Sequence, residues 1–427
     1  MKIDRVIGPI GSLVTCSDKF ITRENPLGVL KKATILVKGE DVVWVGKKDD
    51  VPAEFDLSAA EIEEFSKDTL FPGFIDAHTH LIFAGSRAGE FDMRVQGASY
   101  LEILQAGGGI SSTVRMTREA SYDELYDLGM RRLDAMVREG VTTVEVKSGY
   151  SLTVEGELRL LEIARALDRG HMVDVVPTFL GAHTIPESFK EDPRKYVDIV
   201  IREMLPAVVE KDLAEFCDVF CEEGVFDVET SREILKAAQE KGLKVKVHAD
   251  QLTALGGGRL AAELKATSAE HLEYLPVEDI PLFRQAGTVA VLLPVAGLYL
   301  MMEKTPPVIE LLENGVPVAI ATDFNPGSAP CISLLTTMTL AAIQYRLCSE
   351  DVVKGVTVNA AKAVGREKRI GKIEEGFQAD FVIFPVKEYK LIVTSFGGIR
   401  PSRVMKRGRW VGLSDVRKPI METTMGV

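Results

Sequence analysis

The stretch LFPGFIDAHTH, residues 70–80, decides the fold prediction. It has the pattern of a short buried strand that ends in two histidines separated by one residue. Side chains at positions i and i+2 of a strand point to the same face, so His78 and His80 can reach one metal ion together. Such a pair alone is common by chance, so its meaning depends on the rest of the chain.

Seven further apolar segments follow before about residue 370, and several precede a helical pattern. One such helical pattern, ETSREILKAAQEKG, ends at Gly242, as a capped helix would. Eight strand–helix units predict an α/β fold, a (β/α)8 TIM-like barrel, with an open doubly wound sheet as the alternative. The seven segments are TTVEVKSGY, VDVVPTFLGAH, FCDVFCEEG, LKVKVHAD, KATSAEHL, TVAVLLPVA and VPVAIATDF.

Polar side chains end nearly all of these segments. Barrel enzymes build their active sites at the carboxyl ends of the strands, so these side chains are expected to meet. Five of the six histidines lie there, whereas His171 precedes a strand and fits a structural role. The polar segment ends are His78, His80, Tyr150, His183, Glu222, His248, His271 and Asp323.

Four of these ends form a predicted ligand set for a metal. Three imidazoles and a carboxylate suit one divalent ion, Zn²⁺ or Fe²⁺, with a position left for water. Asp323 could instead be a turn residue ahead of Asn-Pro-Gly. His271 is expected beside the metal in acid–base catalysis, with a buried backbone-bonded histidine as the alternative. The predicted ligands are His78, His80, His248 and Asp323.

The fourth segment favours one metal over two, because it lacks the lysine that binuclear hydrolases of this kind carbamylate. Glu222 could bridge two ions, but one ion is favoured. Lys147, which ends the second segment, is interpreted as structural or loop-stabilising. Cys217 and Cys221 have no second Cys/His pair at zinc-site spacing, so they are expected to be buried thiols.

Both chain ends have a β-rich composition that differs from the middle. KATILVKGEDVVWVGKK predicts a hairpin around its GED turn, and similar β-rich segments return near the end in FQADFVIFP, YKLIVTSF and SRVMKRGRWVG. This predicts a small β-sandwich domain formed from both ends. Its parts would be residues 1–68 and 371–427, around a hydrolase barrel of residues 69–370.

Composition excludes several classes of function. The net charge of −12 argues against nucleic-acid binding, and it means that an anionic substrate needs a local positive group. The sequence contains no run of 18 or more apolar residues, so a membrane partner is not expected. The start lacks the pattern of a secretion signal, and five scattered cysteines suit a reducing cytoplasm.

Longer motifs resemble the imidazolonepropionase family of the amidohydrolase superfamily. They are FPGFIDAHTHLIFAGSRAGEF, KSGYSL, FLGAHTIP, VHADQL, GGGRLAAELKATSAEHLEYL and TDFNPGS. The histidine pair and later aspartate mark only the superfamily, whereas SRAGEF, KSGYSL, GAHTIP and DFNPGS are more specific. The resemblance covers the whole barrel and continues into residues 369–376. It implies hydrolysis of the ring C–N bond of 4-imidazolone-5-propanoate to N-formimino-L-glutamate, in histidine catabolism, by a metal-activated water.

The resemblance also implies residue roles. Arg87 offers a planar fork for the propionate carboxylate, although without SRAGEF around it a surface arginine would be the default. Gln251 cannot accept a proton where some members have glutamate, so proton transfer is assigned to Asp323 and His271. A homodimer is expected from the family alone. Substrate-binding roles fall to Arg87, Tyr150, His183 and Gln251, and product-binding roles to Asn325, Gly327 and Ser328.

Two other functions stay open. One is hydrolysis of another cyclic amide, or deamination, within the same superfamily. The other is an inactive scaffold, which the presence of every metal-ligand candidate argues against. Arg87 together with Tyr150 favours a small-molecule substrate that bears a carboxylate.

Overall fold

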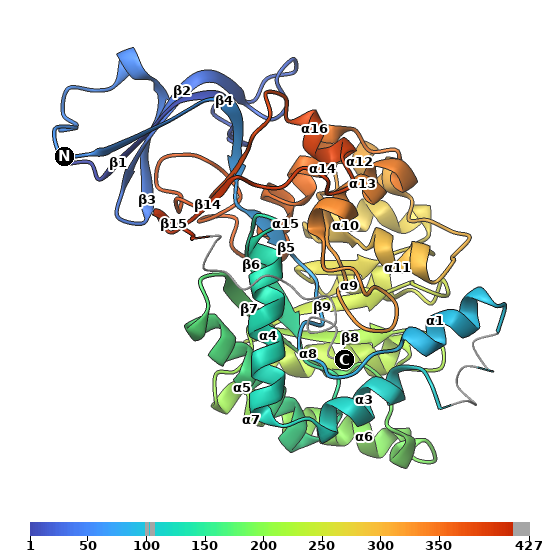
Figure 1. Cartoon of the computed structure of the whole chain (residues 1–427). Coiled ribbons are helices and arrows are strands. Elements are labelled where there is room, and N and C mark those ends of the chain that lie inside the picture. Colours follow the sequence, from blue (N-terminus) through green and yellow to red (C-terminus); the bar gives the residue numbers. More distant parts are fainter. Residues whose placement is uncertain (99–101, 103–106, 413–427) are drawn as a thin grey trace.

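Eight parallel strands, adjacent in chain order, form the barrel of the computed structural model, which describes residues 1–98, 102 and 107–412 (Figure 1). They coincide with the eight predicted segments. The strands are β5 Phe74–Asp76, β6 Val141–Lys147, β7 Asp174–Ala182, β8 Phe216–Cys221, β9 Lys244–Ala249, β10 Ser268–His271, β11 Val289–Leu292 and β12 Val318–Ile320.

The first and last strands meet through the residues that follow them. Thr79 and Phe324 form a parallel bridge, and the Asp323 amide donates to the His78 carbonyl at 3.0 Å. Beneath this bridge, the Asp76 carboxylate accepts hydrogen bonds from the amide and hydroxyl of Thr322 at 3.0 and 2.7 Å. The predicted (β/α)8 barrel is confirmed, and the open sheet is wrong.

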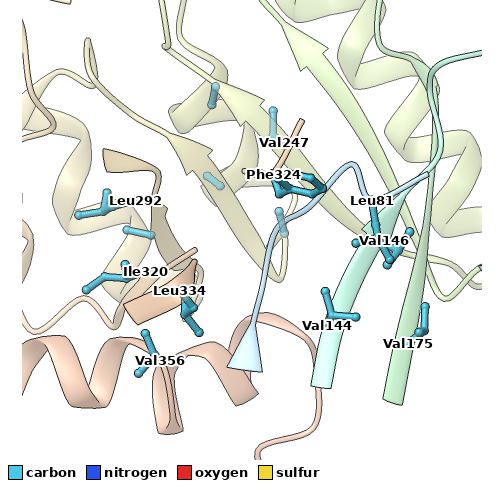
Figure 2. Packing of buried hydrophobic residues seen from close by; sticks show 14 of the residues in the cluster. Leu81, Val144, Val146, Val175, Val247, Leu292, Ile320, Phe324, Leu334 and Val356 are labelled. Atoms are coloured by element: carbon cyan, nitrogen blue, oxygen red, sulfur yellow. The ribbon is translucent and has the colours of Figure 1, made fainter. Parts of the chain in front are cut away.

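The core explains why these segments form strands. Strands of a parallel barrel are covered on both faces, so they consist largely of β-branched and other apolar residues without polar alternation. Figure 2 shows part of the shared core, in which side chains from the barrel strands pack with those from the outer helical layer. Its labelled members include Val144, Val146, Val175, Val247, Leu292, Ile320, Leu334 and Val356.

Local signals set the helix ends. A capping box of Ser121 and Glu124 begins α4, and α8 ends just before Gly242, which has a φ of +88°. No helix in the described ranges is long and apolar enough to cross a membrane. The helices are α1 Ala88–Val95, α3 Ile110–Glu119, α4 Tyr122–Val137, α5 Val154–Gly170, α6 Pro193–Ile199, α7 Leu205–Glu210, α8 Val228–Glu240, α9 Gly257–Glu263, α10 Ile280–Ala286, α11 Pro294–Tyr299, α12 Val308–Glu313, α13 Leu334–Tyr345, α14 Ser349–Gly355, α15 Val358–Ala363 and α16 Lys390–Thr394.

The two chain ends build a second, smaller unit, as predicted, and its seven strands join in one mixed sheet of order β15-β14-β13-β4-β1-β2-β3 (Figure 1). The predicted hairpin is β2 and β3, which turn at Gly39 with a φ of +59°. Residues 413–427 of the expected C-terminal part lie outside the described residues. The strands are β1 Arg5–Val14, β2 Val29–Lys38, β3 Asp41–Lys47, β4 Glu61–Pro72, β13 Phe381–Phe384, β14 Arg403–Lys406 and β15 Arg409–Trp410.

One segment differs from its β-rich prediction. YKLIVTSF contains the short helix α16, so its strand-like reading is wrong. Ile392 and Val393 are buried, and the Thr339 hydroxyl on α13 donates to the Val393 carbonyl at 2.5 Å. Packing against α13 therefore outweighs the β propensity of the isolated segment.

Candidate active site

A cavity of about 620 Å³ lies at the carboxyl ends of the barrel strands. It brings together every predicted site residue except His78, which lies fully buried beneath it. The predicted residues that line it are His80, Arg87, Tyr150, His183, His248, Gln251, His271, Asp323, Asn325, Gly327 and Ser328. Apolar side chains that the sequence had not indicated complete the wall, among them Phe220, Leu252 and Met302.

The predicted metal ligands converge at the base of this cavity. His78 Nε2 and His80 Nε2 lie 3.3 and 3.5 Å from Asp323 Oδ1. The ring of His248 lies 4.6 Å from that of His78, between ring centroids. Ligand atoms of His78, His248 and His271 form a second group within 4.8 Å of one another, so His78 belongs to both groups.

Several buried nitrogens in this cluster have no hydrogen-bond partner among the described residues. They include both ring nitrogens of His78 and of His248. Unpartnered buried polar atoms are rare because they lose their bonds to water on folding. A metal ion at this point would take one ring nitrogen of each histidine, so the donor set fits a metal such as Zn²⁺ or Fe²⁺.

Burial also keeps these imidazoles neutral. It lowers the pKa of His78, His80 and His271 well below the usual range, and neighbouring histidines and Lys147 lower it further. At neutral pH each ring therefore has the lone pair that a metal ligand needs. Burial raises the pKa of Asp323 to about 7, against an opposing effect of His248.

Two aromatic side chains cover His80. The His183 ring stacks on the His80 ring, with centroids 4.9 Å apart and planes 13° apart. His183 Nδ1 lies 3.1 Å from the Gly149 carbonyl, which can only accept, so Nδ1 bears the proton and Nε2 is an acceptor. The Tyr150 ring lies 5.5 Å from the His80 ring and 5.3 Å from the His183 ring, between centroids.

The guanidinium of Arg87 is partly occupied by Glu90 on α1. Nε lies 3.0 Å from both Glu90 carboxylate oxygens, and Nη2 lies 2.8 Å from Oε2. The same Oε2 accepts the Gly109 amide at 3.1 Å, directly before α3. The sequence predicted that this guanidinium binds the propionate. Among the described residues, only its Nη1 has no carboxylate partner.

Gly327 provides the space for Nη1. A Cβ placed on this glycine would lie 1.7 Å from Nη1, closer than any real contact. Gly327→Ala should therefore displace the Arg87 guanidinium and raise KM about 10-fold, with a smaller change in kcat. Steady-state kinetics measure both. Gly297→Ala, whose Cβ would meet nothing closer than 3.9 Å, is the control that should keep the wild-type KM. Equal KM values for the two variants would contradict the prediction.

Asn325 shapes the loop that holds Gly327. Its Nδ2 donates to the Asp323 carbonyl at 2.7 Å and to Ser328 Oγ at 2.8 Å. Its Oδ1 accepts the amides of Gly327 and Ser328, both at 2.8 Å. All four hydrogen-bonding positions of the amide are thus used within the loop, so Asn325 presents its neighbours to a ligand.

Comparisons with known proteins agree with this site. Residues 69–411 match the amidohydrolase family. Imidazolonepropionases of Shewanella amazonensis and Shewanella frigidimarina are 47% and 46% identical to the chain, over 90% and 91% of it and 94% and 95% of their own lengths. The chain belongs to the imidazolonepropionase family.

Solved structures extend the likeness in fold. A zinc-bound adenosine deaminase from Xanthomonas campestris gives a TM-score of 0.72 at 18% identity, over 96% of this chain and 93% of that one. Atrazine chlorohydrolase from Arthrobacter aurescens TC1, complexed with zinc, gives 0.69 at 18% identity, over 96% and 95%. These identities are low, so the likeness shows the fold alone.

Within this family fold, sequence reasoning missed a layer of buried charges under the metal candidates. Lys147, interpreted from the sequence as structural or loop-stabilising, lies in this layer. Burial alone would lower its pKa, but Asp218, Glu145 and Glu270 raise it above the ordinary value. The signal that could have revealed the layer was the presence of charged residues inside strands that otherwise consist of apolar residues, as in VEVK and KVKVH.

Glu222 does not belong to the groups of ligand atoms found among the described residues. Its Oε2 accepts the Leu252 amide at 2.8 Å, and its other oxygen accepts the Thr253 hydroxyl. It therefore fixes the loop that follows His248. Cys217 and Cys221 are buried free thiols, as expected.

Glu273, two residues after His271, gives a prediction about pH. Burial, with a smaller effect of Asp323 and Glu222, raises its pKa from 4.5 to about 8. Between these values the folded protein holds a proton that the unfolded chain has released, so this group makes stability fall as pH rises from about 4.5 to 8. In Glu273→Gln this loss should be absent, so its Tm relative to the wild type should rise between pH 5 and 9.

The control for this prediction is Glu278→Gln, whose side chain is exposed. It should follow the wild-type dependence of Tm on pH, measured by differential scanning calorimetry. Parallel curves for Glu273→Gln and wild type would show that Glu273 is ionised in the folded protein.

Proposed function

We propose that this chain hydrolyses the ring C–N bond of the cyclic amide 4-imidazolone-5-propanoate to N-formimino-L-glutamate, a step of histidine degradation. The observation that carries the proposal is the identity of 46–47% with imidazolonepropionases over about 90% of the chain. The cavity supports it independently, because a cationic side chain and a polar cluster face one space at the mouth of the barrel.

A divalent ion, Zn²⁺ or Fe²⁺, belongs to this proposal. Its ligands would be His78, His80, His248 and Asp323. Unpartnered buried nitrogens on the histidines, and burial that keeps His78 and His80 neutral, suit the role. When bound, such an ion supplies Lewis-acid polarisation and lowers the pKa of water. The adenosine deaminase and the atrazine chlorohydrolase with the same fold hold zinc.

The residues around the cluster would bind and orient the substrate. Arg87 would hold the propionate carboxylate through Nη1, because Glu90 uses its other edge. His183 Nε2 would accept a ring N–H, since its Nδ1 is committed to Gly149. The Tyr150 hydroxyl and the Gln251 amide would complete the contacts to the ring. The loop of Asn325, Gly327 and Ser328 would bind the product, with its shape fixed by the two amides that donate to Asn325 Oδ1.

Two residues would move protons. Asp323 would take the proton of the attacking water and pass it to the departing ring nitrogen, after which the C–N bond is open. His271 would steady the oxygen that develops negative charge or share this proton. Assistance of this kind accelerates a reaction roughly 10²–10⁴-fold.

The test is an assay of the purified, metal-replete protein with freshly prepared imidazolonepropionate. We expect loss of the ring absorbance and formation of N-formimino-L-glutamate, identified by mass spectrometry. Ammonia release from an amino-substituted ring, without ring opening, would favour a deaminase. No turnover of imidazolonepropionate would overturn the specific activity and leave another cyclic amide as the substrate.

The proposal also includes the class of substrate, the location in the cell and the oligomeric state. A substrate that is a small molecule with a carboxylate agrees with Arg87 in a protein of net charge −12. A cytoplasmic location, which rests on the scattered cysteines, and a homodimer, which rests on the family, are parts of the proposal. Cell fractionation and the mass in solution test them, and a monomer would remove the second.

A further inference from the structure

Five charged side chains fill the barrel beneath the metal-ligand cluster, and we call them the charged floor. All five are fully buried. A buried charge is costly unless it is paired and hydrogen-bonded, so each needs a reason to be there. The proposed reaction uses none of them directly. The charged floor consists of Glu145, Lys147, Asp218, Lys246 and Glu270.

Lys147 is the centre of this layer. Its ammonium lies 2.8 Å from Glu145 Oε1, 2.8 Å from Asp218 Oδ2 and 3.9 Å from Glu270 Oε2. Strands β6, β8 and β10 contribute these four residues, so one cation joins three strands of the barrel. The carboxylates are thereby compensated in a place that excludes water.

Asp218 connects this cation to a metal-ligand candidate. Its Oδ2, which contacts Lys147, also lies 2.9 Å from His248 Nδ1. Its Oδ1 accepts the Val219 amide at 2.8 Å and the His248 amide at 3.2 Å. Both oxygens are therefore fixed, one by backbone and one by Lys147.

No other predicted metal ligand has so close a contact on its far side within the described residues. His78 Nδ1 lies 3.9 Å from Glu270 Oε2, and His80 Nδ1 has no partner. His248 Nδ1 and Asp218 Oδ2 are within hydrogen-bond distance, but the two atoms do not form an aligned hydrogen bond.

We propose that Asp218, held by Lys147, is a positioning residue that directs the Nδ1 proton of His248 to its carboxylate and the Nε2 lone pair to the metal. An imidazole can ligate through Nε2 only when its proton is on Nδ1, and a carboxylate beyond the ring favours that tautomer and makes the ring a better donor. The inference rests on the metal site of the proposed function and concerns residues that lie behind that site.

The same geometry assigns a second role to Lys147. Asp218, His248 and Glu270 offer ligand atoms within 4.8 Å of one another, a group that could itself hold an ion. The Lys147 ammonium contacts two of these three residues. The Lys147 ammonium therefore occupies the place where a second metal ion could bind. This agrees with the prediction of one metal per chain.

The test measures metal affinity instead of turnover. Apo protein is titrated with Zn²⁺ against a chromophoric chelator, and Tm is recorded with and without Zn²⁺. Asp218→Asn and Lys147→Met should each bind Zn²⁺ roughly 10- to 100-fold more weakly than wild type, the range for loss of such partners of metal ligands. The rise in Tm on adding Zn²⁺ should shrink accordingly.

Lys246→Met is the matched control. Lys246 is also fully buried and ion-paired with Glu270, at 3.5 Å, but it bonds Ser268 and the Ala363 carbonyl at 2.9 Å and lies outside the contacts of Asp218. The Lys246→Met variant should lower the Tm of the apo protein. Its Zn²⁺ affinity should change less than about 3-fold, because Asp218 still contacts His248. A merely structural role of the floor would make all three variants alike.

Each outcome decides between the ideas. Wild type that takes up no Zn²⁺ or Fe²⁺ overturns the metal site of the proposed function. Wild-type affinity in a folded Asp218→Asn or Lys147→Met overturns this inference alone. If either single variant fails to fold, the double variant, which removes one charge of each sign, replaces it, and wild-type affinity there has the same meaning.

Discussion

Replacing His80 with alanine is expected to remove the bound metal and to lower kcat/KM roughly 10³-fold or more, since a bound ion contributes several kcal/mol to catalysis. His80 Nε2 lies 3.5 Å from Asp323 Oδ1 at the base of the cavity. Its loss would leave His78 and Asp323 with one fewer neutral donor and open space beneath His183. Metal content by mass spectrometry and steady-state kinetics measure the two effects.

The control is His171→Ala, which changes the one histidine outside the site. His171 Nε2 contacts Asp134 at 3.4 Å and its Nδ1 accepts the Val173 amide, so its role is local. This variant should lose some thermal stability and keep its metal and its kcat/KM. A His80→Ala protein that retains full metal and activity would place the metal site elsewhere.

Replacing Arg87 with methionine should raise KM for the acid about 10- to 100-fold, because a hydrogen bond between charged groups contributes about 1.5–3 kcal/mol. Methionine keeps the apolar length of the side chain and removes the charge that faces the cavity. The change in Tm should be small, since Arg87 is only partly buried. The same variant should bind the neutral amide of the substrate as well as wild type does.

Glu90 complicates this variant, because the change leaves it without its arginine. The double variant Arg87→Met/Glu90→Gln removes both charges and separates the two effects. If the double variant recovers a wild-type KM, repulsion by Glu90 caused the defect. If Tm falls strongly while KM stays constant in both, Arg87 is structural.

The sequence predicted the barrel and the meeting of polar strand ends well, because both follow from local patterns. Apolar segments such as KVKVH end in a polar residue, and barrel closure places such ends together. The charged floor could not be predicted in this way. Lys147 and Asp218 are on strands β6 and β8, and nothing local indicates that they pair.

Two other features of the structure that the sequence did not predict depend on contacts between side chains. Arg87 and Glu90 both lie in the motif SRAGEF, but the motif does not show that their side chains contact each other. YKLIVTSF has strand-like composition, and its helix depends on α13. In both cases the deciding contact comes from tertiary structure, which single-sequence patterns do not encode.

The join between the first and last strands has a consequence for how the protein assembles. His78 and His80 follow β5, whereas Asp323 follows β12, so three of the four predicted ligands lie at that seam, on both of its sides. The site cannot exist until the final strand has docked, which makes it a late product of folding with the most distant contacts of the barrel. A metal ion bound by residues on both sides of the seam would stabilise the contact between β5 and β12. Removal of the ion by a chelator should therefore destabilise this contact first. Hydrogen exchange of the Asp323 amide, bonded across the seam to His78, would report that opening.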